Sequence, residues 1–172
     1  MSLMKNIVVA YDTDYAIGGN GDLPWAGQIP ADMKRFRDLT MGNAVIMGRT
    51  TFESLPESYR PLPGRQNIVL TLGKLAANEG FQVAHSLDEA YALAESEEVF
   101  VIGGGKVYAE AIDTVDRIYA TEIYTKAPDV DTYFPVPVDS DWTEVERRSF
   151  SSDGRNKYRH SFVTYLRNHP IV

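Results

Sequence analysis

One carboxylate inside an apolar pattern is the leading candidate for acid–base chemistry. Asp32 follows Pro30, which suits the first position of a helix, and it shares a helical face with Met33 and Phe36. A carboxyl group among apolar side chains loses hydration, which raises its pKa and suits it to proton handling. The plainer alternative is a solvated aspartate that only complements the helix dipole, and spacing alone favours that alternative.

Two strand–glycine–helix junctions have the layout of anion sites. The apolar run Val99–Ile102 leads into three glycines, Gly103–Gly105, and then into residues with helix-forming character at 106–111. A second buried run, Ala44–Met47, is followed by Gly48, Arg49, Thr50 and Thr51. Such junctions aim backbone N–H groups at an anion, commonly a phosphate. Tight turns without any ligand are the alternative.

The glycine triplet matches neither of the common nucleotide fingerprints. A P-loop would need glycine and a hydroxyl residue where Phe100 and Val107 stand, and Tyr108 occupies the third glycine position of a dinucleotide motif. The loop therefore indicates an anion without identifying it. A third glycine-rich stretch, 16–22, reads as a hairpin turn or as a mobile loop over a site, and Leu23-Pro24-Trp25 favours the loop.

Composition excludes several classes of function. The chain has 172 residues, a net charge of −7 and no cysteine. An acidic chain is a poor partner for nucleic acid or anionic membranes, and thiol chemistry is excluded. His85, His160 and His169 lack ligand spacing, so no metal is expected. We expect a cytoplasmic monomer with one domain over residues 1–172, without membrane segment or leader, in which Met1–Leu3 is a cloning remnant.

Hydrophobic periodicity supplies the elements that must position these residues. Apolar runs predict strands at 6–12, 44–47, 66–71, 81–83, 99–102 and 117–124, separated by helices that begin near 30, 49, 86 and 106. Strands at 142–150 and 158–166 predict a C-terminal antiparallel hairpin. The fold class is α/β, with a mixed, mostly parallel central sheet of about eight strands and helices on both faces. Ligands in such sheets bind at the carboxyl ends of the strands, which is where the glycine-rich stretch 16–22 and the two glycine junctions lie.

The ordered set of motifs resembles the dihydrofolate reductase family over residues 6–166. The resemblance is carried by Ile17-Gly18 with Leu23-Pro24-Trp25, by Pro30-Ala31-Asp32-x-x-x-Phe36, by Val45–Arg49 with Thr51–Ser54, by Arg60–Arg65 with Asn67, by Val101–Gly105 with Val107-Tyr108, and by Asp131-Thr132-x-Phe134-Pro135.

The resemblance implies NADPH-dependent reduction of 7,8-dihydrofolate to tetrahydrofolate, and binding of antifolate-type small molecules. Asp32 would hold the pterin 2-amino group and N3 and help deliver a proton to N5, while hydride passes from nicotinamide C4 to pterin C6. Arg65 would grip the glutamate tail, with Arg60 close by. The implied catalytic residues are Asp32, Trp25, Thr121 and Tyr108. The implied substrate contacts add main-chain carbonyls of Val8 and Ile102 and apolar walls from Val9, Met33, Phe36 and Leu55.

The resemblance also implies a two-sided cofactor site. Ala10 and Ile17 would hold the carboxamide through backbone groups, and a cis peptide is implied between Gly103 and Gly104. Arg49 would grip the 2′-phosphate, assisted by Thr71 and Lys106. The implied cofactor set is Ala10, Ile17, the lid residues Gly18, Gly19, Asn20, Gly21, Asp22 and Leu23, the first junction Gly48, Arg49, Thr50 and Thr51, then Thr71 and Leu72, and the second junction Ile102, Gly103, Gly104, Gly105, Lys106, Val107 and Tyr108.

Some stretches depart from the shorter bacterial pattern. Residues 26–28 and 56–59 lengthen two loops, Leu72 replaces a polar or basic residue, and Lys106 replaces a frequent arginine. Two other functions compete: a reductase of the same fold acting on a pyrimidine intermediate of riboflavin synthesis, and a non-catalytic nucleotide-binding module. Asp32, Phe36 and Arg65 favour the folate enzyme, because a pterin edge and a glutamate tail would use all three.

Overall fold

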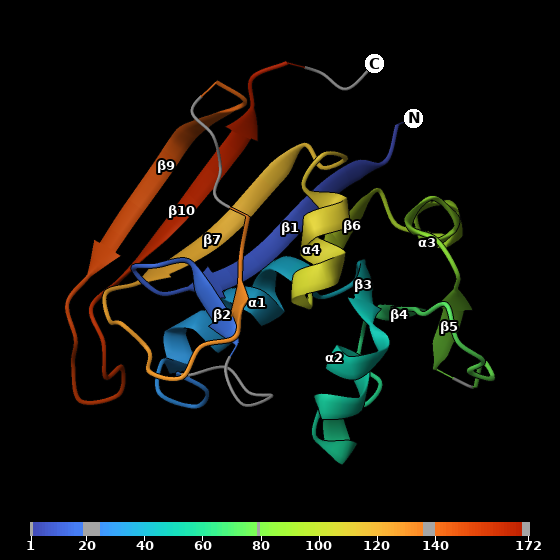
Figure 1. Cartoon of the computed structure of the whole chain (residues 1–172), viewed down its shortest axis with the longest axis horizontal. Helices are drawn as coiled ribbons and strands as arrows, with labels where there is room; N and C mark the ends of the chain where they lie inside the picture. Colours follow the sequence, from blue (N-terminus) through green and yellow to red (C-terminus); the bar gives the residue numbers. More distant parts are fainter. Residues whose placement is uncertain (1, 19–24, 79, 136–139, 170–172) are drawn as a thin grey trace.

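The central feature of the computed structural model is an eight-stranded sheet with the order β5-β4-β3-β6-β1-β7-β10-β9 (Figure 1). The structure describes residues 2–18, 25–78, 80–135 and 140–169. The strands of this sheet are β1 (Met4–Tyr11), β3 (Ala44–Gly48), β4 (Gln66–Leu70), β5 (Phe81–Ala84), β6 (Glu98–Val101), β7 (Arg117–Ile123), β9 (Trp142–Phe150) and β10 (His160–Arg167).

The sheet is parallel except at one edge. β1 runs parallel to β6 and β7, and β3, β4, β5 and β6 continue the parallel pairing. β10 pairs antiparallel with both β7 and β9. The predicted mixed sheet and C-terminal hairpin are therefore confirmed, although β10 begins at His160, two residues later than expected.

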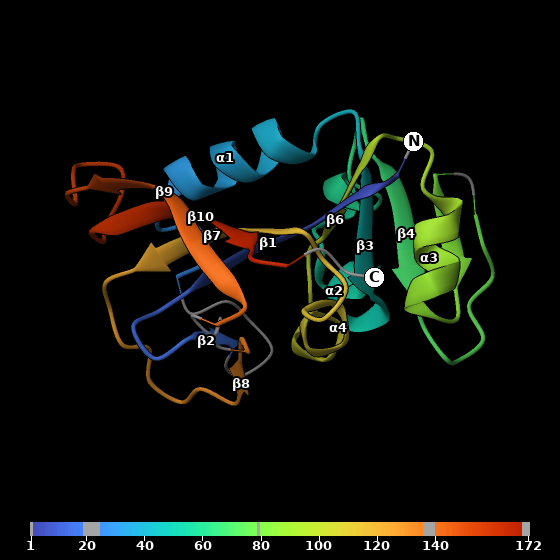
Figure 2. The same cartoon turned by 90° about the horizontal axis from the view of Figure 1, so that it is seen from above.

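Helices cover both faces of the sheet. Figure 2 shows α1 on one side of the sheet and α4 on the other. The helices are α1 (Pro30–Thr40), α2 (Arg49–Ser54), α3 (Leu87–Leu93) and α4 (Gly105–Ala111), with a 3₁₀ turn, η1 (Glu57–Tyr59), in a stretch expected to be loop. No helix in the described ranges combines the length and the apolar character needed to span a membrane.

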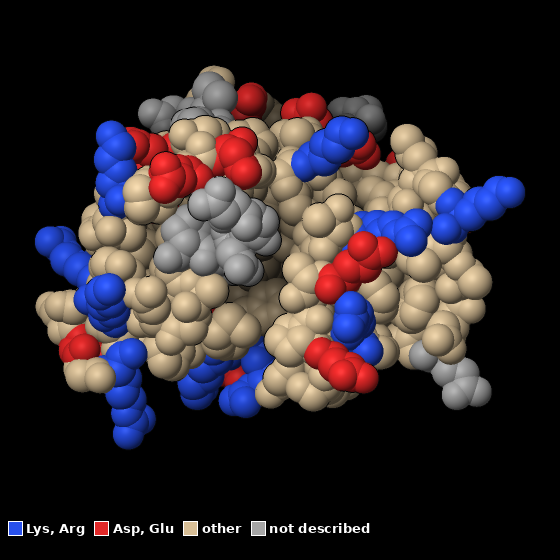
Figure 3. All heavy atoms as spheres, turned by 60° about the horizontal axis from the view of Figure 1, so that its bottom comes forward, with Lys and Arg blue, Asp and Glu red and all other residues tan. Residues whose placement is uncertain are grey.

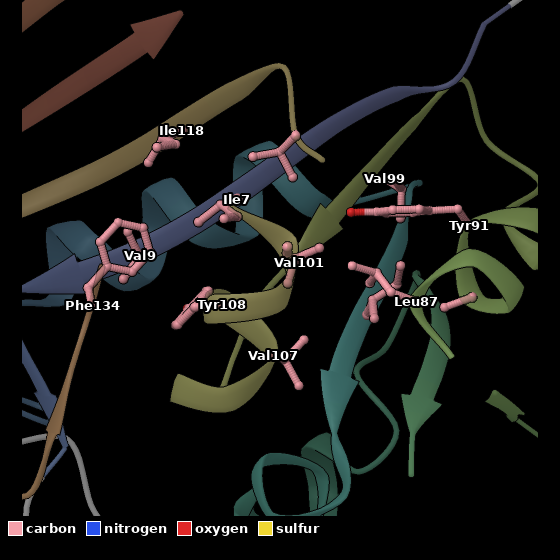
Figure 4. Packing of buried hydrophobic residues seen from close by; sticks show 14 of the residues in the cluster. Ile7, Val9, Leu87, Tyr91, Val99, Val101, Val107, Tyr108, Ile118 and Phe134 are labelled. Atoms are coloured by element: carbon pink, nitrogen blue, oxygen red, sulfur yellow. The ribbon is translucent and has the colours of Figure 1, made fainter. Parts of the chain in front are cut away.

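Two large hydrophobic clusters, one on each face of the sheet, hold these layers together. On one face, the sheet packs against α3 and α4, and Figure 4 shows Leu87, Tyr91, Val107 and Tyr108 meeting the strand residues. On the other face, Phe52 of α2 packs among buried strand residues, with side chains of α1 at the border. Because side chains alternate along a strand, each central strand contributes to both cores.

A second, two-stranded sheet differs from the sequence expectation. Residues 16–18 form β2 (Ala16–Gly18), which pairs with β8 (Thr132–Tyr133), where a continuous glycine-rich loop was expected. The amide of Asp131 also donates to the Gly18 carbonyl at 3.0 Å. This pairing joins segments more than a hundred positions apart, so local composition carries no signal for it.

Candidate active site

The carboxyl ends of the central parallel strands form one edge of the sheet. There, the end of β3 is tied to the residues that follow β6: the Ile102 amide donates to the Ile46 carbonyl at 2.9 Å, and the Gly48 amide donates to the Gly103 carbonyl at 2.8 Å. Figure 3 shows a hollow near the centre of the face seen from this side, with Lys and Arg side chains near its rim. Both glycine junctions therefore open at one edge, as the topology predicts.

Asp32 lies in the first turn of α1 and reaches across to β7. Its Oδ1 accepts a hydrogen bond from the Thr121 hydroxyl at 2.7 Å. Thr121 is itself buried and is paired in register with Ala10 of β1. The carboxyl group is thus fixed beside the ends of two parallel strands.

Burial raises the pKa of Asp32. The Thr121 hydrogen bond opposes this effect, as do the charge of Arg35 and the nearby His160 ring, and burial outweighs all three. The direction of this shift is the one that the sequence pattern predicts for a carboxyl group among apolar side chains.

The surroundings of Asp32 differ in part from the sequence expectation. Phe36 packs at the border of the α1-side core, but Met33 is 57% exposed. Asp32 is desolvated by β7 and its neighbours instead, because the helix turns its Asp32 side toward the sheet and carries Met33 out toward solvent. Val9 also differs, since its side chain lies in the opposite core, beside α4. Only the main chain of Val9 remains for a substrate.

Tyr108 links α4 to the first strand. Its hydroxyl donates to the Val8 carbonyl at 2.7 Å. Burial raises the pKa of this phenol, and the nearby Asp32 charge raises it further. Tyr108 is therefore a neutral donor near the carboxylate. The Val8 carbonyl retains a second lone pair for a ligand.

Trp25 is almost fully buried at the approach to α1. It packs with Ile29 and Ile123, and Ala10 lies against this small cluster. Its indole Nε1 is buried and has no hydrogen-bond partner within the described residues. A buried N–H of this kind is suited to a bound water or ligand.

The two glycine junctions approach each other closely. The peptide between Gly103 and Gly104 is cis, as the resemblance implied, and Gly103 has φ +123°. A Cβ on Gly104 would lie 3.2 Å from Thr51 Oγ1, and one on Gly105 would overlap Thr132 Cγ2. A side chain at either glycine would therefore crowd its neighbours. Val107 was also predicted to contact the cofactor, but its side chain is buried in the core, so only its main chain remains for a ligand.

Arg49 is held at the start of α2. Its Nε donates to Glu53 Oε1 at 2.7 Å, and its Nη1 donates to the Lys74 carbonyl at 3.2 Å. Thr71 accepts from the Gly73 amide at 3.1 Å, and Leu72 is 93% exposed. Arg49 therefore faces the chain that follows β4. Thr50 and Lys106 are exposed at the two junctions.

Arg65 is oriented by main-chain and helix contacts. Its Nε donates to the Pro63 carbonyl at 2.9 Å, and its Nη1 donates to Thr40 Oγ1 at 3.2 Å. The guanidinium carbon lies 6.0 Å from the centre of the Phe36 ring. Burial, followed by the charge of Arg37, lowers the pKa of Arg65. An arginine beside an apolar wall can bind a carboxylate at the end of an aromatic ligand.

Other predicted contacts have varied positions. Arg60 is exposed and donates to the Glu53 carbonyl at 3.0 Å, and Leu55 packs at the border of the α1-side core with Ile102. Ile17 is buried on β2, and Gly18 pairs with Thr132. The predicted lid residues Gly19, Asn20, Gly21, Asp22 and Leu23 lie outside the described residues.

Three residues near the site were missed by sequence reasoning. Thr40 holds Arg65, and Arg35 and His160 lie close enough to Asp32 to lower the pKa of its carboxyl group. Arg35 follows Asp32 by three positions, a helical spacing that could have indicated the pair. Nothing in the sequence indicates that His160 approaches Asp32, because this approach depends on the pairing of β10 with β7.

Comparison with known proteins agrees with this geometry. The family model described as dihydrofolate reductase matches residues 4–167. Dihydrofolate reductase type 3 of Salmonella typhimurium is 40% identical over 166 residues, which cover 96% of this chain and 99% of that protein. Dihydrofolate reductase of Bacillus subtilis is 36% identical over 163 residues, 94% of each chain.

A solved structure shows the same architecture. Dihydrofolate reductase from Enterococcus faecalis, complexed with NADP(H) and RAB-propyl, superposes with a TM-score of 0.84 and 38% identity over 96% of this chain and 97% of its own. Sequence and fold thus agree over nearly the whole chain. The chain belongs to the dihydrofolate reductase family.

Proposed function

We propose that the protein reduces 7,8-dihydrofolate to 5,6,7,8-tetrahydrofolate with NADPH, and so supplies one-carbon metabolism. The observation that carries this proposal is the Asp32 carboxyl group, held by Thr121 at 2.7 Å beside the ends of the parallel strands. A non-catalytic nucleotide-binding module would have no use for a desolvated carboxylate at this place.

The substrate would lie between Asp32 and Arg65. The carboxylate can accept two hydrogen bonds from the 2-amino group and N3 of a pterin, and the carbonyls of Val8 and Ile102 can accept from its opposite edge. Phe36 and Leu55 supply apolar surface from the α1-side core. Arg65 would pair with the glutamate carboxylate in a charge-assisted contact.

The two glycine junctions fit a dinucleotide. The bare backbone of Gly103–Gly105 and the amide-rich start of α2 would receive the pyrophosphate, because glycine lets a ligand approach the main chain and the start of a helix presents free N–H groups. Arg49, Thr71 and Lys106 would hold the 2′-phosphate, and the main chain of Ala10 and Ile17 the carboxamide. When bound, NADPH supplies the hydride that reduces pterin C6.

Proton delivery would depend on Asp32 and its neighbours. Burial keeps a proton on or near the carboxyl group at higher pH than an exposed aspartate would. The buried Trp25 Nε1 would hold a water that connects this group to N5 of the substrate. Tyr108 stays protonated and supports the Val8 carbonyl.

The test is loss of NADPH absorbance in the presence of dihydrofolate. Asp32→Asn preserves the side-chain shape and the acceptor for Thr121, but it cannot exchange a proton in this range. We expect kcat/KM to fall by about 10²- to 10⁴-fold at neutral pH, the usual worth of a proton-transferring group. No turnover by the unaltered protein, or full activity in the variant, would contradict the proposal.

The same variant should become more stable. The folded-state pKa of Asp32 lies above its unfolded value, so stability is present below the unfolded pKa and is lost as pH rises through the folded pKa. Asparagine does not ionise, so the variant avoids this loss of folding stability. Its Tm at neutral pH should therefore be higher than that of the unaltered protein. The Tm difference should shrink as pH falls toward 4, and a variant less stable at pH 7 than the unaltered protein would contradict it.

A further inference from the structure

Arg35 attaches α1 to the strand that holds the Asp32 carboxyl group. It lies one helical turn after Asp32, and its Nη1 donates to the Ala120 carbonyl at 2.8 Å. Ala120 directly precedes Thr121, whose hydroxyl binds Asp32. The helix therefore contacts two consecutive residues of β7, once through a carboxylate and once through a guanidinium.

The position of the guanidinium is fixed by aromatic rings as well. Its central carbon lies 4.7 Å from the centre of the Phe162 ring and 5.8 Å from that of Tyr119. Both rings belong to strands of the central sheet, β10 and β7. Cation–π contacts strengthen when the cation is partly desolvated, and burial here lowers the pKa of Arg35 while Asp32 raises it. The positive charge is thus held at one place rather than free in solvent.

Other charged groups surround this pair. On β9, Arg148 and Glu146 face Arg35 and pair with each other at 3.2 Å, so their charges largely offset. On β10, His160 faces Asp32 and is buried. From α4, the neutral Tyr108 completes the surroundings of the carboxyl group. Among these groups, Arg35 contributes a permanent charge at every accessible pH.

We propose that Arg35 is a positioning residue that holds a fixed positive charge one helical turn from Asp32, and that this charge favours the ionised carboxylate over the neutral acid. The inference rests on the proposed function, because it assigns Arg35 a part in the reaction through Asp32. A nearby opposite charge favours the ionised form of a carboxyl group. Ionised Asp32 accepts two hydrogen bonds from a pterin edge, which the neutral acid cannot.

The test is a titration of the Asp32 carboxyl carbon by NMR in the ligand-free protein, with Asp32→Asn identifying the resonance. Arg35→Gln keeps a donor for the Ala120 carbonyl but removes the charge. We expect its Asp32 midpoint to move to higher pH. Arg35→Lys keeps the charge without the planar fork and should return the midpoint toward that of the unaltered protein.

A matched control removes a charge elsewhere on the same helix. Lys34 is exposed, pairs with Asp38 at 2.7 Å and changes the net charge equally when replaced by Gln. In Lys34→Gln, the pH midpoint of the Asp32 titration should stay unchanged. The pH midpoint of kcat/KM for dihydrofolate should move in the same direction as the NMR midpoint, and only in Arg35→Gln.

The outcomes separate this inference from the proposed function. A midpoint in Arg35→Gln equal to that of the unaltered protein overturns the role of Arg35, even if turnover falls, because Arg35 would then act only as a packing contact. The same conclusion follows if Arg35→Lys titrates like Arg35→Gln. Absence of turnover in the unaltered protein would overturn the proposed function, whereas the NMR midpoints would still report whether the two charges are coupled.

Discussion

Arg65 shows how a binding side chain depends on a neighbour outside its own loop. The Pro63 carbonyl orients one nitrogen of the guanidinium, and the Thr40 hydroxyl, on α1, orients another. Thr40 is buried, and its hydroxyl donates to the Phe36 carbonyl at 2.8 Å. This bond fixes the orientation of the hydroxyl, which leaves its oxygen free to accept from Arg65. The grip on a glutamate tail should therefore be sensitive to Thr40.

Thr40→Val removes this acceptor with little change of shape. Loss of one hydrogen bond to a charged group costs about 1.5–3 kcal/mol, so we expect KM for dihydrofolate to rise roughly ten- to hundredfold, with kcat little changed. Thr40→Ser should restore KM. A dihydropteroate lacking the glutamate should show no such rise, and an equal rise for both substrates would remove Arg65 and Thr40 from the tail site.

At the residue scale, sequence reasoning identified chemistry but not partners. Asp32 stood out because a carboxylate followed a helix start among apolar residues. Its Thr121 partner is 89 positions away, and nothing local to Asp32 indicates it. The outward turn of Met33 was also invisible, since helical spacing defines a stripe but not its borders.

At the scale of elements, the start of α1 is stabilised from a distant loop. Ile29 at the N-cap offers no side-chain acceptor. Instead, Asn156, between β9 and β10, accepts from the Ala31 amide at 3.0 Å, and the Lys157 amide donates to the Gln28 carbonyl at 2.9 Å. Asp153 accepts from the Asn156 amide at 2.7 Å and thereby shapes the loop. The first turn of α1, which carries Asp32, is therefore capped by the loop of the β9–β10 hairpin.

Asn156→Ala should weaken this cap. A lost N-terminal cap costs about 1 kcal/mol, so Tm should fall by roughly 2–4 °C in a chain of this size. We expect kcat/KM for dihydrofolate to fall as well, because Asp32 sits in the capped turn. Asn156→Asp retains the acceptor and should preserve both values. A Tm unchanged in Asn156→Ala, measured by differential scanning calorimetry, would contradict the cap.

Element boundaries were largely predictable, and long-range pairing was not. The parallel strands were visible as short apolar runs because both of their faces are buried, and the start of α3 followed from its capping box, in which Ser86 accepts from the Glu89 amide at 3.0 Å. β2 and β8 are only three and two residues long. Each of these short strands forms only because it pairs with the other, so neither has a sequence signal of its own.

At the scale of the whole molecule, β9 forms an exposed outer edge of the sheet. After its buried first residue, Trp142, every residue of this strand is exposed, and charged side chains follow one another along it at Glu144, Glu146, Arg147 and Arg148. Charged residues on an edge strand oppose pairing with another chain. Arg147 also forms ion pairs with Glu122 of β7 at 2.9 Å and with Glu144 of β9 at 2.7 Å, so its guanidinium is held against the sheet.

We therefore propose that the protein is a monomer. Light scattering coupled to size-exclusion chromatography should give a mass near that of one chain, 19.2 kDa. Arg148→Val removes one of the edge charges and should favour self-association at high concentration. A dimer of the unaltered protein that persists on dilution would refute the proposal.

The antiparallel end of the sheet also makes the candidate site depend on long-range strand pairing. His160 and Phe162 lie near the start of β10, opposite the end of β7, so the surface beneath Arg35 and Asp32 comes from a strand more than a hundred positions further along the chain. A molecule in which β10 has separated from β7 would still contain Asp32, Thr121 and both glycine junctions, but it would lack this backing. Local opening of this pair of strands should therefore abolish folate binding while the parallel strands stay paired.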